Sequence, residues 1–370
     1  MTDTESPCRS IEIVDVGGDA LGRGRAFGQT RSNEITAWMS DWLNSLQSSG
    51  IAEPRVYITE MLGDTDFLTA IRQHTPDLLE EVQGMASGAG MPLEIALAAQ
   101  YMDEEWAYRR LVLNGSQVIE KCSAVAMVAA GGPTWIGQNM DLGAYTDGHS
   151  VLLRARGRFS EPGTLIFTIG GMIGLLGVND RGIGVCVNSL PQLPSAREGV
   201  PVAFVIRKLL QATTLQEAVH SVQMLPHATG QHYLIADPFR IKSYEASPEG
   251  VREFRQSDPS RVLHTNHPFT DLKSAPMSAR YEANSVARLN SLTTRLGNGP
   301  GGLEAIQSAL SSFDDADNPI CKLRGAGCEP NALTSLTAGS MISALRENAV
   351  ESWVSAGPPS IGGYRHVTLS

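Results

Sequence analysis

The sequence predicts an α+β protein in which antiparallel sheets are covered by helices. Helical apolar periodicity dominates the first third of the chain, and strand signals dominate from residue 122 to residue 188. After that point, helices and strands alternate in groups, whereas strict alternation of single strands and helices would indicate a parallel sheet. Two stacked sheets between helix layers satisfy this order of elements. No repeat and no long linker divides the chain, so one structural domain is expected.

The first third of the chain is predicted to be helical. Apolar residues recur with the spacing of one helix face at Ile35, Trp38, Met39, Trp42, Leu43 and Leu46. Residues 76–85 and 92–111 are expected to form two further helices, separated by the small residues 87–90.

Groups of strands and helices follow from residue 150 onward. Strands are predicted at residues 151–154, 164–168, 182–188, 233–236, 241–244 and 261–264. Helices are predicted at residues 202–210, 277–292, 303–312 and 337–347, and Thr214 with Glu217 forms a capping box that opens one more. Two short strands near Ser352 and Tyr364 are expected to end the chain.

A hairpin is predicted around a single cysteine. Residues 123–130 are small and apolar, as in a short buried strand, and Gly131-Gly132-Pro133 indicates a turn into the returning strand at 134–138. The hairpin would place Cys122, at the start of one strand, beside Asp141, at the end of its partner. A thiol and a carboxylate would then share one end of a sheet. Taken alone, Cys122 also fits simple packing, because free cysteine is among the most buried residue types.

The composition excludes several classes of protein. The formal net charge is −10, with 39 acidic and 29 basic residues, which argues against nucleic acid or an anionic membrane surface as the main partner. The acidic N-terminus resembles no signal peptide, and no apolar run is long enough to span a membrane. The few scattered cysteines favour a reducing, cytoplasmic setting, and they are Cys8, Cys122, Cys186, Cys321 and Cys328. Their spacing suits no zinc site, so we expect no metal and no cofactor.

Three other patterns were weighed. The GGxxG pattern at 169–174 lies between strands with no phosphate-binding helix after it, so a dinucleotide site is not expected. The acidic run 314–318 lacks the glycine and closing glutamate of a calcium loop and fits a solvated turn. His264 and His267 form the only close histidine pair, so a Cys–His dyad with Cys122 stays open as an alternative.

Several motifs occur in the order shown by one family. They are Cys122-Ser-Ala, Gly137-Gln-Asn-Met-Asp141, Gly177-Val-Asn-Asp-Arg-Gly182, Val187-Asn188, Leu263-His-Thr-Asn-His267 and Pro319-Ile-Cys321. Together they resemble the acyl-coenzyme A:6-aminopenicillanic acid acyltransferase family, which is also peptidase family C45 of the N-terminal-nucleophile hydrolases. Choloylglycine hydrolase and penicillin V acylase are more distant relatives. The resemblance runs from the Gly22-Arg-Gly-Arg-Ala-Phe-Gly28 segment almost to the C-terminus.

The resemblance implies a four-layer αββα sandwich that cleaves itself between Lys121 and Cys122. Residues 1–121 would become a helix-rich α chain, and residues 122–370 a β chain that begins with the nucleophile. The new α-amine, with a reference pKa near 8, could take the proton of its own thiol, so no histidine is needed. Asp141 matches the family's residue that holds the terminal ammonium, and Asn266 matches its oxyanion-hole asparagine.

Two departures from the family pattern matter. Lys121 stands where the family usually has glycine, whose freedom helps the strained backbone before self-cleavage. The family's penicillin-forming members also carry a late Ser-Arg that contributes to catalysis, and the matching region after Gly327 has no arginine. Arg324 is nearby but out of position, and Arg280 is a poorer substitute. Penicillin synthesis is therefore not favoured.

The expected function is that of a cytoplasmic, self-processing cysteine amidase. It would cleave or transfer the acyl group of a small N-acylated amine or amino acid through an acyl-enzyme on Cys122. Hydrolysis is favoured because no nucleotide-binding signature is present, although acyl-CoA stays open as a partner. The two chains from one precursor would form a heterodimer, with larger oligomers left open. The alternatives are an uncleaved thiol hydrolase that uses His264 or His267, and an inactive relative that serves binding or assembly.

Overall fold

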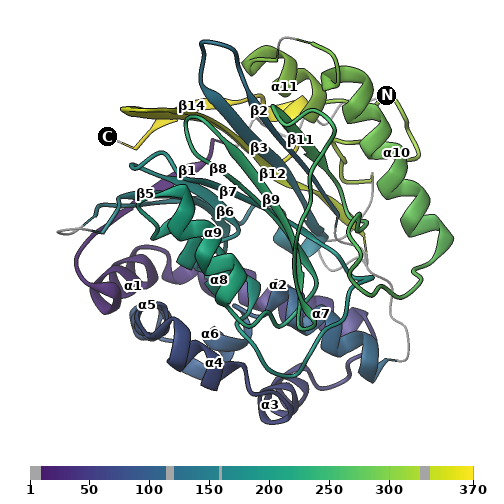
Figure 1. The fold of residues 1–370 in the computed structure, drawn as a ribbon. Helices are drawn as coiled ribbons and strands as arrows, with labels where there is room; N and C mark the ends of the chain where they lie inside the picture. The colour runs from purple at the N-terminus through teal and green to yellow at the C-terminus, as the bar shows by residue number, and fades with distance from the viewer. Residues whose placement is uncertain (1–9, 114–120, 158–160, 300, 326–333, 370) are drawn as a thin grey trace, which may run out of the picture.

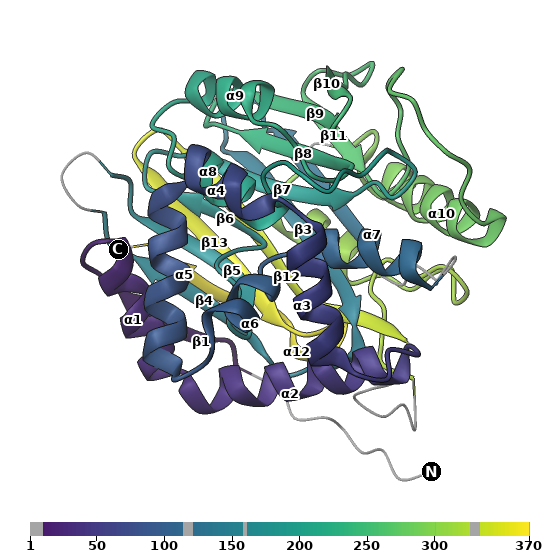
Figure 2. The ribbon, with the colours of Figure 1, turned by 90° about the horizontal axis from the view of Figure 1, so that it is seen from below.

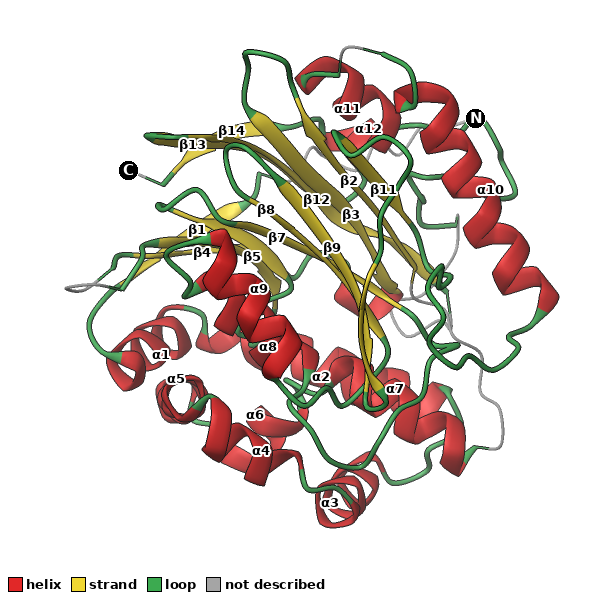
Figure 3. Cartoon of the chain, viewed as in Figure 1, coloured by secondary structure: helices red, strands yellow, loops and turns green. Residues whose placement is uncertain are grey.

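Two β-sheets lie face to face between two layers of helices in the computed structural model (Figures 1 and 3). The structure describes residues 10–113, 121–157, 161–299, 301–325 and 334–369. Cys8, Cys328 and most of the region expected to match the family's late arginine lie outside these residues. In the described part of the chain, no helix is both long and apolar enough to cross a membrane.

The first sheet runs through strands from both halves of the chain. Its order is β1 (Glu12–Val16), β4 (Ser150–Ala155), β5 (Thr164–Ile169), β6 (Leu176–Asn179), β7 (Gly184–Ser189), β8 (Gln231–Ala236), β9 (Ile241–Ser247) and β10 (Gly250–Glu253). Neighbouring strands are antiparallel except β1, which pairs in parallel with β4.

The second sheet contains the predicted hairpin and is antiparallel between all described neighbours. Its order is β11 (Arg261–His264), β2 (Lys121–Val128), β3 (Thr134–Gly143), β12 (Ser335–Arg346), β13 (Ala349–Ala356) and β14 (Arg365–Thr368). A short 3₁₀ turn, η1 (Ala144–Thr146), follows β3.

The helices form the two outer layers. On the side of the first sheet lie α1 (Ala20–Thr30), α2 (Ser32–Ser48), α3 (Pro54–Asp64), α4 (Phe67–His74), α5 (Pro76–Ala89), α6 (Leu93–Ala98), α7 (Met102–Val112), α8 (Val202–Leu210) and α9 (Leu215–Met224) (Figure 2). On the side of the second sheet lie α10 (Ala279–Leu296), α11 (Leu303–Leu310) and α12 (Pro359–Gly362) (Figure 1). This arrangement is the predicted αββα sandwich, so the fold class is confirmed.

The segment before Lys121 is an integral layer of this sandwich. It supplies β1 to the first sheet and α1–α7 to the outer layer (Figure 2). Helices α1 and α5 approach backbone to backbone, since a Cβ atom at Gly24 would overlap the Glu81 carbonyl and one at Gly28 would overlap the Met85 carbonyl. The glycines of the N-terminal motif are therefore needed for helix packing.

Two predicted elements were wrong. Residues 337–347 form strand β12, whose residues are buried on both faces up to Leu345, so the alternation of a half-exposed strand is missing and its apolar run looks helical. Residues 92–111 form two helices, α6 and α7, instead of one. Between them, the buried Gln100 side chain bonds to the backbone of Gly171 and Ile173 in the loop after β5.

Candidate active site

The start of strand β2 brings the predicted site residues together. In the β2–β3 hairpin, Cys122 lies opposite Met140, and Lys121 lies opposite Asp141. Since neighbouring residues of a strand point to opposite faces, Cys122 faces the first sheet, whereas Lys121 and Asp141 share the face toward α10. The thiol and the carboxylate thus lie at the same end of the sheet on its two faces.

The backbone of Cys122 is held by two buried side chains. Its N–H donates to Asn266 Oδ1 at 2.8 Å, and its carbonyl oxygen accepts from Arg288 Nη1 at 2.6 Å. Arg288 Nη2 also donates to Asn266 Oδ1 at 2.8 Å, which closes a triangle around Cys122. Asn266 Nδ2 donates to the carbonyl oxygen of Ser189 at 2.9 Å. Asn266 and Arg288 are 0% and 1% exposed, so these bonds are shielded from water.

Asp141 is a buried carboxyl group with a fixed partner. Its Oδ1 accepts a hydrogen bond from Thr337 Oγ1 at 2.7 Å, and Thr337 Oγ1 in turn accepts from the backbone N–H of Lys322 at 2.8 Å. Burial raises the pKa of Asp141, and the charge of Arg288 opposes that shift. The side chain is therefore oriented by β12 toward the start of β2.

The thiol of Cys122 is unreactive in the continuous chain. Burial raises its pKa to about 12, and the negative charge of Asp141 adds to the effect. The sulfur lies 4.0 Å from Met140 Sδ, in an apolar setting. Because the thiolate is the nucleophile, a thiol with this pKa needs a nearby base before it can react at neutral pH.

Arg288 is the site residue that sequence reasoning missed. It lies on α10, where its Nε donates to Asn284 Oδ1 at 3.0 Å and its Nη1 donates to Ser123 Oγ at 2.9 Å. A signal was present, since Asn284, Ser285 and Arg288 interrupt the buried face of an otherwise amphipathic helix. Of the two arginines considered from sequence, Arg324 bonds to Asp147 instead.

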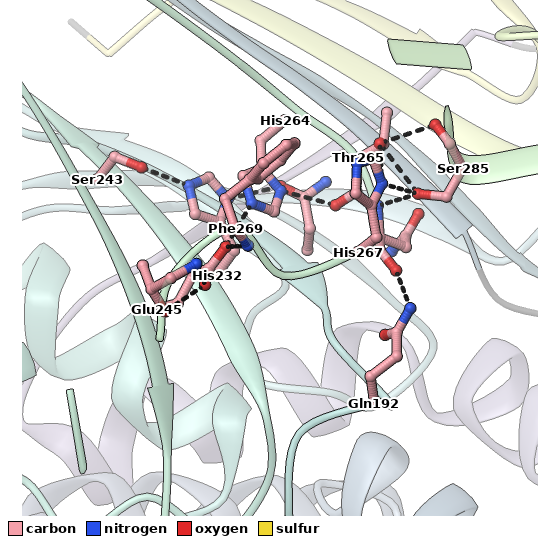
Figure 4. Close-up of polar contacts among 12 residues, drawn as sticks. Gln192, His232, Ser243, Glu245, His264, Thr265, His267, Phe269 and Ser285 are labelled. Carbon is pink, nitrogen blue, oxygen red and sulfur yellow. Dashed lines mark hydrogen bonds and ion pairs between the residues drawn. The ribbon is translucent and has the colours of Figure 1, made fainter. Parts of the chain in front are cut away.

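The histidine pair has other partners (Figure 4). His264 Nδ1 bonds to the carbonyl oxygen of Thr265 at 2.8 Å, and its Nε2 lies 3.2 Å from Glu245 Oε1. His267 Nδ1 bonds to Ser285 Oγ at 2.8 Å, and burial lowers the pKa of His267 to about 4. All three printed partnerships tie the rings to the turn around Asn266, which argues against either histidine as the base for Cys122.

The same network fixes the turn that carries Asn266. Its backbone N–H donates to Ser285 Oγ at 2.8 Å, and its carbonyl oxygen accepts from Gln192 at 3.2 Å (Figure 4). Beyond the turn, the Glu245 carboxylate accepts from the backbone N–H groups of Phe269 and Thr270. Asn266 is therefore positioned by buried polar contacts on both sides.

A cavity of about 570 Å³ opens beside the residue that precedes Cys122. Its walls combine the start of the hairpin, the N-terminal part of α10 and the segment 313–323. The lining residues are Lys121, Asp141, Arg280, Asn284, Phe313, Ala316, Asp317, Asn318, Pro319, Cys321, Lys322 and Leu323.

Comparison with protein families assigns the chain. The model of the acyl-coenzyme A:6-aminopenicillanic acid acyl-transferase family matches residues 128–343, more than half of the 370 residues. The chain belongs to this family. The matched region of this acyl-transferase family member contains Asp141, Asn266 and Arg288, and it begins after Cys122. The resemblance identified from sequence motifs is thereby confirmed.

Solved structures similar to this family member are amide hydrolases, whereas no curated protein matches the chain. An N-acylethanolamine-hydrolyzing acid amidase ortholog from Caenorhabditis elegans has 14% identity, a TM-score of 0.45, and coverage of 60% of this chain and 92% of its own. Conjugated bile acid hydrolase from Clostridium perfringens has 13% identity, a TM-score of 0.43, and coverage of 67% and 96%. Penicillin V acylase from Agrobacterium tumefaciens has 14% identity, a TM-score of 0.38, and coverage of 64% and 83%.

Proposed function

We propose that this protein is a self-processing cysteine amidase whose nucleophile is Cys122. One observation carries the proposal: buried Asn266 and Arg288 hold the backbone N–H and carbonyl of Cys122, at the end of the sheet where Asp141 lies. Burying an arginine and an asparagine costs free energy unless their hydrogen bonds are satisfied. Spending these groups on the backbone of one cysteine is expected if that backbone must be positioned for a reaction.

The first reaction is cleavage of the chain at its own nucleophile. The Cys122 thiol attacks the carbonyl carbon of Lys121, the peptide C–N bond breaks, and the thiol proton passes to the freed amine. Water then hydrolyses the thioester, which leaves a carboxylate on Lys121 and a free thiol and amine on Cys122. Because residues before Lys121 form β1 and an outer helix layer, the two chains would stay together as a heterodimer.

The freed amine supplies the base that the continuous chain lacks. Its reference pKa near 8 lets a fraction of it stay neutral at physiological pH and accept the thiol proton. Asn266 Oδ1 already accepts a hydrogen bond from this nitrogen, and Asp141, on the neighbouring strand, would orient the ammonium. The thiolate then attacks the substrate carbonyl and expels the amine, and water or another amine releases the acyl group.

Stabilisation of the tetrahedral oxygen is assigned to Asn266. One N–H of its carboxamide is used by Ser189, so the second N–H would donate to the developing oxyanion. Arg288 is assigned the task of holding both Asn266 and the Cys122 carbonyl in place, since it touches each of them. It thus takes the place for which Arg280 and Arg324 were considered from sequence.

The substrates proposed are small N-acylated amines or amino acids. Hydrolysis is favoured over transfer, with acyl-CoA as an alternative donor because the family's name describes an acyl-CoA-dependent transferase. A reducing, cytoplasmic setting is supported by Cys122, Cys186 and Cys321, which are all buried and free of disulfides.

Trapping the acyl-enzyme tests this function. The purified protein is incubated with a panel of N-acyl amines and N-acyl amino acids, quenched in acid, and digested for mass spectrometry. We expect an acyl mass on the peptide that starts at Cys122, and its absence in Cys122→Ser, together with release of the amine product. Turnover that leaves no acyl group on Cys122 but labels another residue would contradict the assignment.

A further inference from the structure

The cavity beside Lys121 has a surplus of positive charge. Lys121, Arg280 and Lys322 line it, whereas its two carboxylates are Asp141, which is already bound by Thr337, and Asp317, which lies exposed at the rim. Buried Arg288 lies directly behind the wall formed by Lys121. A cavity with low-dielectric walls and one sign of charge concentrates ligands of the opposite sign.

The state of Lys121 reports the same field independently. Its ammonium forms no described ion pair. Its pKa is lowered to about 8, first by burial and then by the charges of Arg288 and Lys322, with only partial compensation from Asp141. The positive groups therefore outweigh the carboxylate at this point, and an anion in the cavity would relieve the repulsion among them.

Arg280 is not explained by helix stability. It lies in the first turn of α10, where the helix macrodipole favours an acidic residue and disfavours a basic one. Its side chain lines the cavity wall. Opposite the basic residues, Phe313 and Leu323 are 48% and 41% exposed, so the cavity also offers apolar surface.

We propose that this cavity binds a carboxylate group of the substrate, with Arg280 and Lys322 as its partners and Phe313 and Leu323 against its apolar part. This inference rests on the proposed amidase function. It narrows the substrates to amides that carry a carboxylate, such as N-acyl amino acids, and sets them apart from neutral N-acylated amines.

Matched substrate pairs test the inference in the mature, two-chain enzyme. An N-acylglycine is compared with its N-acylglycinamide, which is neutral and nearly the same shape, and an N-succinyl alkylamine is compared with its neutral succinamide. The first pair places the carboxylate on the amine half and the second on the acyl half. We expect one of the pairs to show a preference for the acid of roughly 10- to 100-fold in kcat/KM, as a charge-assisted hydrogen bond gives.

Substitutions then locate the carboxylate. In Arg280→Gln and Lys322→Gln, the preference for the acid should fall toward one, mainly through KM. The matched control is Arg295→Gln, which removes the same charge from the same helix, because Arg295 pairs with Asp314 outside the cavity lining. This control should keep the preference of the wild-type enzyme.

Three outcomes separate the two claims. If acid and neutral amide are turned over equally in both pairs, the carboxylate site is wrong while the amidase function stands. If the cleaved enzyme turns over none of the four compounds nor any other N-acyl amide, the proposed function itself fails. If carbodiimide treatment joins the new Lys121 carboxylate to the Lys322 amine in the substrate-free enzyme, the cavity belongs to the chain's own terminus and the inference is overturned.

Discussion

Strands β2 and β7 face each other across the two sheets, and each carries a buried cysteine. Burial raises the pKa of both thiols, and Cys122 and Cys186 are 5% and 2% exposed. The thiols alone would not reveal which one is chemical. The difference lies in the backbone: Cys186 pairs with Leu234 within a regular ladder, whereas Cys122 is bonded to the side chains of Asn266 and Arg288.

This comparison shows where the cost of the site is placed. At β7, a cysteine fills apolar space between the sheets and needs nothing further. At β2, an arginine, an asparagine and a carboxyl group are buried together, and each needs compensating hydrogen bonds. Such a cluster is weak support for stability as its purpose and better support for a reaction.

The largest expected difference separates the two cysteines themselves. Cys122→Ala should leave the chain intact and abolish activity, because the same sulfur cleaves the chain and attacks the substrate. Cys186→Ala should lower the free energy of unfolding by about 1–2 kcal/mol through a small cavity, with cleavage and turnover retained. Denaturing gels, activity assays and urea unfolding of both variants check this. Equal loss of activity in the two would remove the distinction between the strands.

Arg288 is expected to come next in size. Arg288→Met keeps much of the side-chain volume but leaves the Cys122 carbonyl and Asn266 Oδ1 without a donor. Maturation should slow by roughly 10- to 100-fold, as expected for losing hydrogen bonds to a charged group. Arg288→Lys should recover part of that rate, since one donor and the charge remain. A time course of chain cleavage for each variant measures this, and a Met variant that matures at the normal rate would show that Arg288 only fills space.

Asn266 separates two roles for one carboxamide. If its N–H stabilises the oxyanion, Asn266→Ala should lower kcat by roughly 10²–10³-fold with little change in KM, and Asn266→Asp should be worse because a carboxylate repels the developing charge. If its main task is to hold the Cys122 nitrogen through Oδ1, Asp should match or exceed Ala, because a carboxylate accepts from an ammonium and from Arg288 more strongly. Kinetics of matured enzyme, with melting temperatures as the control for folding, decide between them.

Lys121 should have the smallest effect on the mature enzyme. Lys121→Gly is expected to speed maturation, because glycine reaches the strained backbone before the scissile bond at lower cost. Turnover by the matured enzyme should change little with a neutral substrate. Rates of cleavage and of turnover measured on the same preparation test this, and unchanged cleavage would exclude backbone strain as the brake.

Local patterns in the sequence predicted the hairpin and the fold class, but not every element. The small residues before the Gly131-Gly132-Pro133 turn were sufficient to place Cys122 beside the residues opposite it. Strand β12 was missed because it is buried on both faces, which removes its alternation. Arg288 was missed because its partners, Cys122 and Asn266, are distant in sequence and meet it only when α10 packs on the second sheet.

Intact mass measurement of the purified wild-type protein, with N-terminal sequencing of each chain, tests the central claim most directly. The account predicts two chains that separate only under denaturing conditions, and the larger should begin Cys-Ser-Ala-Val at Cys122. Activity should appear in step with this cleavage. A fully active protein whose 370-residue chain is intact between Lys121 and Cys122 would contradict it.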